Sequence, residues 1–239
     1  MKPRLLDLFC GAGGAGVGYS RAGFAVTGVD IEDHDYPAGE FIIDDAMACL
    51  AERDYLDLFD VVHASPPCQG YTTMSNRYKD AQAEWPKLIE PVREALEAWG
   101  GLYVIENVDG ARKEMRDPIR LAGGMFGLHV DRPRLFESNF PLTSPAYRRP
   151  DHIVGVYGRH HDGRLLWRRA DGTELRCART LEEGQKAMGI DWMNWHDLTE
   201  AIPPAYTHHI GRQLAAHITR DASNEDEEAA GIADEEWVA

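Results

Sequence analysis

The sequence predicts an α/β fold in which a mostly parallel sheet carries helices on both faces. Short apolar segments alternate with segments of helical spacing along residues 4–105, and this alternation is typical of parallel strands joined by crossover helices. A glycine-rich turn at residues 10–16 joins the first strand to the first helix. Acidic residues and a cysteine follow several strands directly, at the edge where such sheets place their chemistry.

The expected elements can be given in chain order. Strands are expected at residues 4–9, 25–29, 41–43, 59–64 and 102–105. Helices are expected from the glycine turn to about residue 22, with Gly23 as a C-cap, and at residues 46–53 and 84–99. Two further strands, residues 153–157 and 165–168, are expected to pair as a β-hairpin in a small β-rich insertion.

Composition indicates a cytoplasmic protein, in a bacterium or a viral host. The 239 residues are 44% hydrophobic and 27% charged, and no apolar run approaches the roughly 20 residues of a membrane helix. The first residues do not resemble a signal peptide. Four cysteines lack metal-binding spacing, so we expect reduced thiols and no metal site. We expect a monomer without a membrane partner.

Charge is unevenly distributed. The net charge of −15 argues against a nucleic-acid partner. Residues 221–239 hold eight acids and no base, which leaves −7 for the rest of the chain. Residues 146–179 hold eight arginines against four acids. A basic segment on an acidic body can still bind a polyanion, and the acidic tail is expected to be disordered.

The glycine turn indicates a nucleotide-like cofactor. Glycine lets the backbone approach a ligand closely, and Asp30, at the end of the next strand, is placed to accept hydrogen bonds from ribose hydroxyls. A turn selected only for packing is the alternative. The pattern leaves nicotinamide, flavin and S-adenosylmethionine open, although the absence of a full G-x-G-x-x-G favours a cofactor without a pyrophosphate.

Cys68 is the candidate nucleophile. Two prolines precede it directly after a buried strand, and they stiffen the loop that holds the thiol. A buried thiol in a proline turn is the alternative. Glu106 ends the next strand of the same sheet, where a carboxyl and a thiol can face one substrate. Burial would raise the pKa of Glu106 and allow it to donate a proton.

Three motifs in this order resemble the first, fourth and sixth motifs of the DNA cytosine-5 methyltransferases. They are Asp7-Leu8-Phe9-Cys10-Gly11-Ala12-Gly13-Gly14, Ser65-Pro66-Pro67-Cys68-Gln69-Gly70 and Glu106-Asn107-Val108. Residues 181–189 and 202–211 are similar to the ninth and tenth motifs. The resemblance covers about residues 4–136 and 180–218. It implies the Rossmann-like fold of S-adenosylmethionine-dependent methyltransferases.

The resemblance also implies a reaction and a set of site residues. Cys68 would add to C6 of a flipped cytosine in DNA, Glu106 would protonate N3, and C5 would then take the methyl group from S-adenosyl-L-methionine. Arg134 would contact the base as a third catalytic residue. The implied cofactor-binding residues are Phe9, Gly11, Gly13, Gly14, Asp30, Ile31, Asp45, Ala46 and Pro67. Among the cofactor-binding residues, Asp30 would hold the ribose and Asp45 would meet the adenine.

Four segments follow from this alignment. Residues 1–136 would form the catalytic and cofactor-binding core, residues 137–179 a small basic recognition segment, residues 180–220 a return to the core, and residues 221–239 the acidic tail. Nucleic-acid contacts are expected from Gln69, Arg132, Arg159, Arg164, Arg168 and Arg169. Because the recognition segment, residues 137–179, is short, we expect a short or relaxed target site. The family's eighth motif is incomplete, because Val130 stands where it has glutamine.

Several alternatives remain at this stage. RNA, especially tRNA, or a mononucleotide could supply the cytosine. A catalytically inactive DNA-binding relative is the non-enzymatic alternative, although both Cys68 and Glu106 are present. Methylation of an amino nitrogen is disfavoured because Ser65 precedes the two prolines, where those enzymes need Asp or Asn. A role in restriction-modification fits the leading interpretation.

Overall fold

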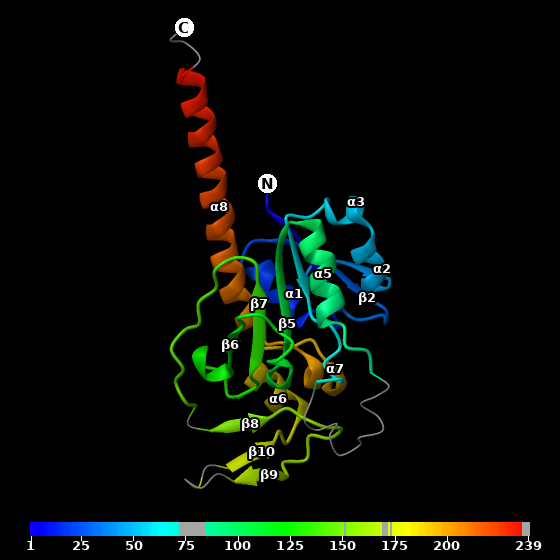
Figure 1. The fold of residues 1–239 in the computed structure, drawn as a ribbon. Helices are drawn as coiled ribbons and strands as arrows, with labels where there is room; N and C mark the ends of the chain where they lie inside the picture. The colour runs from blue at the N-terminus through cyan, green and yellow to red at the C-terminus, as the bar shows by residue number, and fades with distance from the viewer. Residues whose placement is uncertain (72–84, 151, 169–171, 173, 236–239) are drawn as a thin grey trace.

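The main element of the fold is a seven-stranded sheet with the order β3-β2-β1-β4-β5-β7-β6 (Figure 1). The computed structural model describes residues 1–71, 85–150, 152–168, 172 and 174–235, and only the backbone of residues 221–235. The strands are β1 (Arg4–Leu8), β2 (Ala25–Asp30), β3 (Glu40–Ile43), β4 (Val61–Ala64), β5 (Leu102–Val108), β6 (Ile119–Leu121) and β7 (Arg134–Ser138).

The sheet is mostly parallel, as the sequence predicts. Strands β3, β2, β1, β4 and β5 pair in parallel, whereas β7 runs antiparallel to β5 and β6 antiparallel to β7. Strand β5 extends beyond the predicted residue 105, so that Glu106 and Asn107 lie within it rather than after it. The antiparallel pairing with β7 holds this extension, because Glu106 lies opposite Phe136 and Val108 opposite Arg134.

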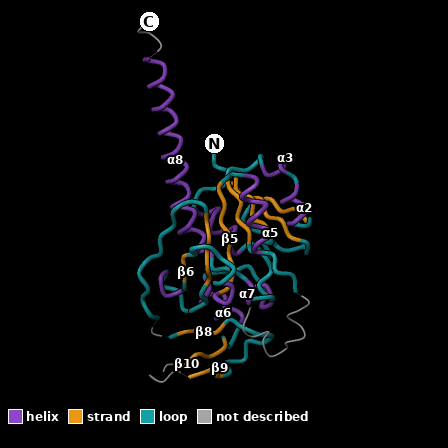
Figure 2. Tube along the Cα trace, viewed as in Figure 1, coloured by secondary structure: helices purple, strands orange, loops and turns teal. Residues whose placement is uncertain are grey.

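Helices cover both faces of the sheet (Figures 1 and 2). Helices α1 (Gly14–Arg21) and α8 (Pro204–Glu235) belong to one core, in which Tyr19, Tyr206 and Leu214 are fully buried. Helices α2 (Ala46–Ala51), α3 (Arg53–Leu56) and α5 (Ile89–Trp99) belong to the core on the other face. The predicted helix at 46–53 is therefore two short helices, and the predicted start of α5 at residue 84 lies outside the described residues.

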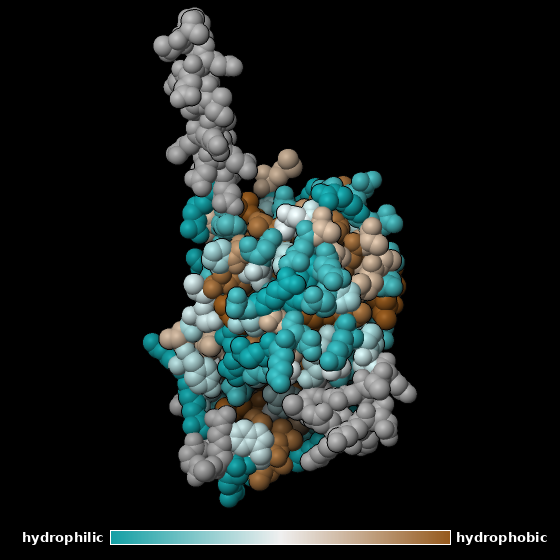
Figure 3. Space-filling view, in the orientation of Figure 1, coloured by the Kyte–Doolittle hydropathy of each residue, from teal (hydrophilic) through white to brown (hydrophobic). Residues whose placement is uncertain are grey.

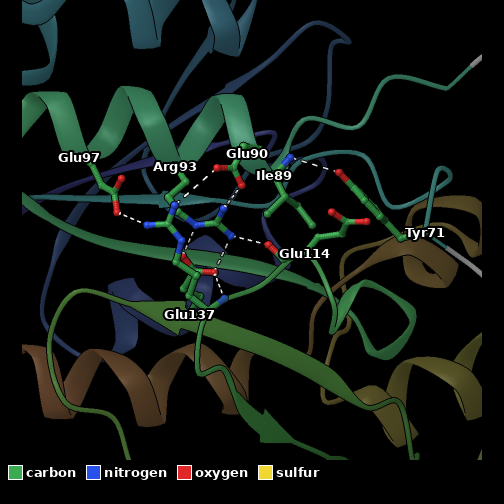
Figure 4. A network of polar contacts seen from close by, with 8 residues as sticks. Tyr71, Ile89, Glu90, Arg93, Glu97, Glu114 and Glu137 are labelled. Atoms are coloured by element: carbon green, nitrogen blue, oxygen red, sulfur yellow. Dashed lines mark hydrogen bonds and ion pairs between the residues drawn. The ribbon is translucent and has the colours of Figure 1, made fainter.

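A buried ion pair joins α5 to β7 (Figure 4). The Arg93 guanidinium donates to both carboxylate oxygens of Glu137, at 2.5 and 2.9 Å, and to the backbone carbonyl of Glu114 at 2.6 Å. The side chains of Arg93 and Glu137 are 1% and 3% exposed. The contact fixes the helix against the antiparallel edge of the sheet, which carries the extension of β5.

The predicted hairpin in the β-rich insertion is wrong in its pairing. Strand β9 (Leu165–Arg168) pairs antiparallel with a third strand, β10 (Glu174–Cys177), and β10 pairs in parallel with β8 (Ile153–Gly155). The order is therefore β8-β10-β9. The sequence of β10, Glu-Leu-Arg-Cys, lacks the β-branched and aromatic residues that typically mark a strand. Pairing on both sides makes it the central strand.

This small sheet is packed onto the carboxyl-end side of the main sheet, beyond α6 (Leu181–Met188) and α7 (Trp195–Glu200) (Figure 1). One hydrophobic cluster contains Val154 of β8, Met188 of α6 and Ala12 of the glycine turn. The indole Nε1 of Trp192 donates to the carbonyl of Ala12 at 2.8 Å. The segment thus rests on the turn that was predicted to hold the cofactor.

Helix α8 continues through Glu235, so residues 221–235 are helical where the sequence suggested a disordered tail. Alanine and glutamate dominate this stretch, and both favour a helix. Figure 1 shows the helix leaving the body as a rod. Residues 236–239 lie outside the described residues. Within the described part of the chain, no helix is both long and apolar enough to span a bilayer.

Candidate active site

The glycine turn provides an open backbone surface at the carboxyl end of β1. Phe9, Gly11 and Gly13 have φ values of 57°, 48° and 79°, a left-handed region that most side chains avoid. A Cβ on Gly11 would meet nothing within 4 Å, whereas one on Gly13 would lie 2.9 Å from the Tyr36 ring and one on Gly14 2.5 Å from the carbonyl of Ile202. Only Gly11 of the three therefore faces open space. Packing explains the other two.

Asp30, at the end of β2, forms a hydrogen bond with this turn. Its Oδ2 accepts a hydrogen bond from the amide of Gly11 at 2.8 Å, and its Oδ1 accepts one from the amide of Glu32 at 3.2 Å. A carboxylate has lone pairs beyond these two bonds. Ile31, the next residue, is 70% exposed. A carboxylate and an exposed apolar side chain thus lie next to the open face of Gly11.

Asp45 and Ala46, the next two residues predicted to bind the cofactor, differ in their exposure. Asp45 is exposed and caps α2, where its Oδ1 accepts from the amide of Met47 at 2.8 Å. Ala46 is 2% exposed and packs in the hydrophobic core. The first turn of α2 directs the Ala46 side chain inward, so a contact between Ala46 and a cofactor would have to come from its backbone.

The loop that carries the candidate nucleophile is held from the neighbouring strand. The Asn107 side chain donates from Nδ2 to the carbonyl of Pro66 at 2.9 Å. The amide of Tyr71 donates to the carbonyl of Cys68 at 3.0 Å and closes a turn. Pro67 and Cys68 are half-buried. Asn107 was not singled out from the sequence, although its position beside Glu106 could have marked it.

Glu106 is a buried carboxyl beside an arginine. It is 5% exposed, and its Oε1 lies 3.0 Å from Nε of Arg134, across the antiparallel pair β5–β7. This oxygen makes no well-directed hydrogen bond to the described residues. Burial raises the pKa of Glu106, while Arg134, a hydrogen bond from Ser65 and Arg132 oppose the rise. The carboxyl is therefore suited to hold a proton that it can donate.

The structure brings Cys68, Glu106 and Arg134 together. Burial raises the pKa of the Cys68 thiol first, and the charge of Glu106 raises it further, while the charge of Arg134 lowers it. The thiol is therefore mainly protonated near neutral pH, and an attack through sulfur requires loss of that proton. Arg134, which is close to both groups, is the positive charge that would stabilise the thiolate.

Arg132 does not lie where the prediction placed it. It is 1% exposed, and its guanidinium donates to the carbonyls of Ala201, Val156 and Thr199 at 2.7, 3.2 and 2.6 Å. A contact with nucleic acid is therefore excluded for this side chain. Its φ of 33° is in the left-handed region, and the three bonds hold this strained backbone between the small sheet and α7.

The arginines of the recognition segment differ in their partners. Arg168 forms an ion pair with Glu174, and Arg164 lies 3.8 Å from Asp162. Arg159 is exposed and has no ion-pair partner among the described residues, while Arg169 lies outside them. Gln69 is half-buried next to Cys68. The segment also exposes hydrophobic side chains, with Leu165 43% and Trp167 39% exposed, and Figure 3 shows hydrophobic surface at this end of the body.

Comparison with known proteins finds similar methyltransferases. No family model matches the chain. It is 31% identical to the type II methyltransferase M.AgeI of Thalassovita gelatinovora over 93 residues, which cover 32% of this chain and 21% of that protein. It is 25% identical to M.AquIA of Picosynechococcus over 182 residues, which cover 65% of this chain and 72% of that protein. The chain thus spans about a fifth of the length of the first relative.

Two solved structures share the fold. One is described as a DNA modification methyltransferase encoded within an E. coli prophage, with a TM-score of 0.60, 15% identity and coverage of 91% of this chain and 99% of that one. The other is the Dnmt2 methyltransferase of S. pombe, with a TM-score of 0.53, 13% identity and coverage of 90% and 99%. This chain therefore has the fold of these methyltransferases and is similar in sequence to type II methyltransferases.

Proposed function

We propose that this protein transfers a methyl group to C5 of cytosine in DNA through a covalent adduct at Cys68. The observation that carries the proposal is the placement of a cysteine, a buried carboxyl and an arginine at neighbouring strand ends, with Arg134 Nε 3.0 Å from Glu106 Oε1. Methylation of an amino nitrogen needs no thiol nucleophile, whereas attack at C5 does, because C5 becomes nucleophilic only after addition at C6.

S-adenosyl-L-methionine is the cofactor that this fold implies, and the turn fits it. The open face of Gly11, the carboxylate of Asp30 and the exposed Ile31 form a surface without a pyrophosphate-binding fingerprint. Phe9 and Asp45 lie at the neighbouring strand ends and would complete this surface. When bound, the cofactor would supply an electrophilic methyl group on sulfur.

The chain's own residues supply the remaining steps. Cys68 loses its proton and adds to C6 of the base, while Glu106 donates a proton to N3, so that electrons move toward C5. After methylation, C5 loses its proton to a water molecule. The Cys68 sulfur then leaves with the electron pair of its bond to C6, and N3 returns its proton to Glu106. Arg134 holds Glu106 and offsets its charge. Asn107 keeps the loop in place through Pro66.

The relatives favour DNA as the polymer, since they are named type II and DNA modification methyltransferases. Cytosine within a duplex must leave the stack before a buried site can reach it, at a cost of a few kcal/mol. The recognition segment is a three-stranded sheet with a few available arginines, and such contacts hold the backbone without specifying sequence. A short or relaxed target site follows.

Methyl transfer to three substrates tests this function. Labelled S-adenosyl-L-methionine is offered with duplex DNA, tRNA or dCMP, and the products are digested to nucleosides. We expect 5-methyldeoxycytidine from DNA and none with Cys68→Ser. Cys177→Ser is the matched control, because the thiol of Cys177 points at the carbonyl of His160, 3.0 Å away, and a hydroxyl can replace it. N4-methylcytosine or N6-methyladenine, or activity in Cys68→Ser, would contradict the proposal.

A further inference from the structure

A chain of buried polar side chains leads from helix α1 to Glu106. The hydroxyl of Tyr19 lies 3.0 Å from Nδ1 of His63, and Nε2 of the same ring lies 2.9 Å from Oγ of Ser65. The Ser65 hydroxyl is close enough to the Glu106 carboxyl to lower its pKa as a hydrogen-bond donor. Tyr19 and His63 are both 0% exposed. The mechanism above uses neither of them.

His63 is an unusual residue for its position. It lies in the middle of the main sheet, paired with Asp7 on β1 and Val104 on β5. Burial lowers its pKa to about 3, so the ring is neutral and has one donor and one acceptor nitrogen. Both nitrogens have partners. In a buried neutral histidine with two partners, the nitrogen that accepts a hydrogen bond fixes the proton on the other nitrogen, which must then donate.

The Tyr19 hydroxyl determines which nitrogen of His63 carries the proton. Among the described residues, the Tyr19 hydroxyl has one hydrogen-bond partner, Nδ1 of His63, and a buried hydroxyl proton that lacks an acceptor is costly. Tyr19 therefore donates to Nδ1, which leaves the proton of His63 on Nε2. This N–H donates to Oγ of Ser65. The Ser65 hydroxyl proton is then directed to its remaining partner, Glu106.

We propose that His63 is a positioning residue that, held in one tautomer by Tyr19, directs the hydroxyl of Ser65 to the carboxyl of Glu106. The proposal depends on the proposed function for its catalytic meaning, because it assigns the control of the proton that Glu106 donates to the base. Hydrogen bonds in such a chain polarise one another. Loss of either upstream group therefore weakens the bond that Ser65 donates.

Other charged and titratable groups also act on Glu106 and remain in place in every variant below. Arg134 and Arg132 act on it from the β7 side, and Glu106 in turn acts on Cys68 in the loop after β4 and on Asp7 of β1. The Ser65 bond favours the ionised carboxyl, so weakening it raises the pKa of Glu106 further. The pH dependence of the reaction should report this change.

Nuclear magnetic resonance tests the geometry without turnover. In protein with ¹⁵N-labelled histidine, long-range ¹H–¹⁵N correlations distinguish the two neutral tautomers from the imidazolium. His63→Gln identifies the signal of His63 among the ten histidines. We expect the neutral Nε2–H tautomer from pH 5 to 8. The Nδ1–H tautomer, or an imidazolium at pH 6, would overturn the proposal whether or not the protein methylates DNA.

The pH dependence of kcat/KM tests the role. The pKa of the carboxyl rises from 4.5 and that of the Cys68 thiol from 9.0, and burial is the first cause of both shifts. The acid limb of the profile therefore reports Glu106. We expect Tyr19→Phe and His63→Leu to move this limb to higher pH by about half a unit. His63→Gln, whose amide can both accept and donate, should restore the parental position.

Tyr55→Phe is the matched control, since its buried hydroxyl has no hydrogen-bond partner among the described residues. It should leave the acid limb unchanged. Cofactor affinity, measured by calorimetry, should be the same in all of these variants. An acid limb that stays in place in both Tyr19→Phe and His63→Leu would overturn the positioning role. If neither variant folds, the tautomer in the unmodified protein still decides the proposal.

Discussion

Glu106 combines two properties that the proposed chemistry requires, burial and a nearby positive charge. Its side chain is 7% exposed, and Nε of Arg134 lies 3.0 Å from its Oε1. Burial raises the pKa of the carboxyl, and the charge of the arginine opposes this rise. Neither property can be obtained from the Glu-Asn-Val motif alone, because both depend on the antiparallel strand β7.

Glu106→Gln should reduce kcat by roughly 10²- to 10⁴-fold, because an amide can form a hydrogen bond to N3 but cannot donate a proton to it. Cofactor affinity should be retained, since the glycine turn lies on other strand ends. Single-turnover methyl transfer with saturating cofactor measures the effect. A variant within threefold of the parental rate would show that Glu106 is not the acid.

Asp7 should make stability depend on pH. Burial raises its pKa to about 7 from 3.8, despite a hydrogen bond of 3.0 Å from Tyr36. Because the folded pKa is the higher one, the contribution to stability is complete below about pH 4 and is lost as pH rises through 7. The free energy of unfolding of Asp7→Asn should therefore rise relative to that of the parental protein between pH 5 and 8, by at most about 4 kcal/mol.

Urea unfolding at pH 5, 6.5 and 8 measures this difference. Asp60→Asn serves as the control, because Asp60 is exposed and accepts a hydrogen bond from the amide of Arg4 at the edge of the core. A constant difference between Asp7→Asn and the parental protein across these pH values would contradict the assignment.

At the scale of elements, the pair Arg93–Glu137 should hold α5 against β7. Glu137→Leu removes the only buried carboxylate that pairs with Arg93 among the described residues and leaves it the exposed carboxylate of Glu90 and the carbonyl of Glu114. This loss should destabilise the protein by about 3–5 kcal/mol. The double variant Arg93→Met with Glu137→Leu should regain much of this loss. Glu97→Leu, which removes an exposed ion pair of 2.6 Å with Arg116, should cost less than about 1 kcal/mol. Equal losses in the two single variants would refute the distinction.

Elements with a strong local signal were predicted well from the sequence. The first two strands, the glycine turn and the first helix lie within two residues of their predicted limits. Strand β10 could not be predicted, because pairing on both sides rather than β propensity stabilises it. Likewise, an arginine in a loop gives no local sign of burial, so the three carbonyls around Arg132 were not foreseen.

The candidate site was predictable to the extent that its residues end neighbouring strands. Cys68 and Glu106 were expected to face one substrate, and the charge of Glu106 raises the pKa of the Cys68 thiol. His63 was missed because a single polar residue in an apolar strand has no periodic signal. Its spacing of two from Ser65, the first residue after β4, was the available clue, because residues two apart in extended chain point to the same side.

At the scale of the whole molecule, the net charge of −15 should make DNA binding weak and dependent on a few cations. Arg159→Ala should lower the slope of log affinity against log salt by about 1. Arg168→Ala should change it less, because Glu174 already neutralises that guanidinium. Arg53→Ala is the control, because Arg53 begins α3, and α3 lies at the opposite end of the body from the small sheet in Figure 1.

Fluorescence anisotropy of labelled duplexes at several salt concentrations gives these slopes. Equal effects of Arg53→Ala and Arg159→Ala would mean that the small sheet does not contact the phosphates. Bisulfite sequencing of methylated DNA measures the target site in turn. We expect a short or relaxed site, and five or more specified bases would contradict the role assigned to the recognition segment.

The central claim is that Cys68 bonds covalently to cytosine during methyl transfer. Duplex DNA with 5-fluorocytosine at the target tests it most directly, because fluorine at C5 cannot leave as the proton does and the adduct persists. With S-adenosyl-L-methionine present, intact mass spectrometry should show the protein joined to one methylated strand, and digestion should place the bond at Cys68. Methylation of the unmodified duplex without any such adduct, or an adduct at Cys10, Cys49 or Cys177, would contradict the account.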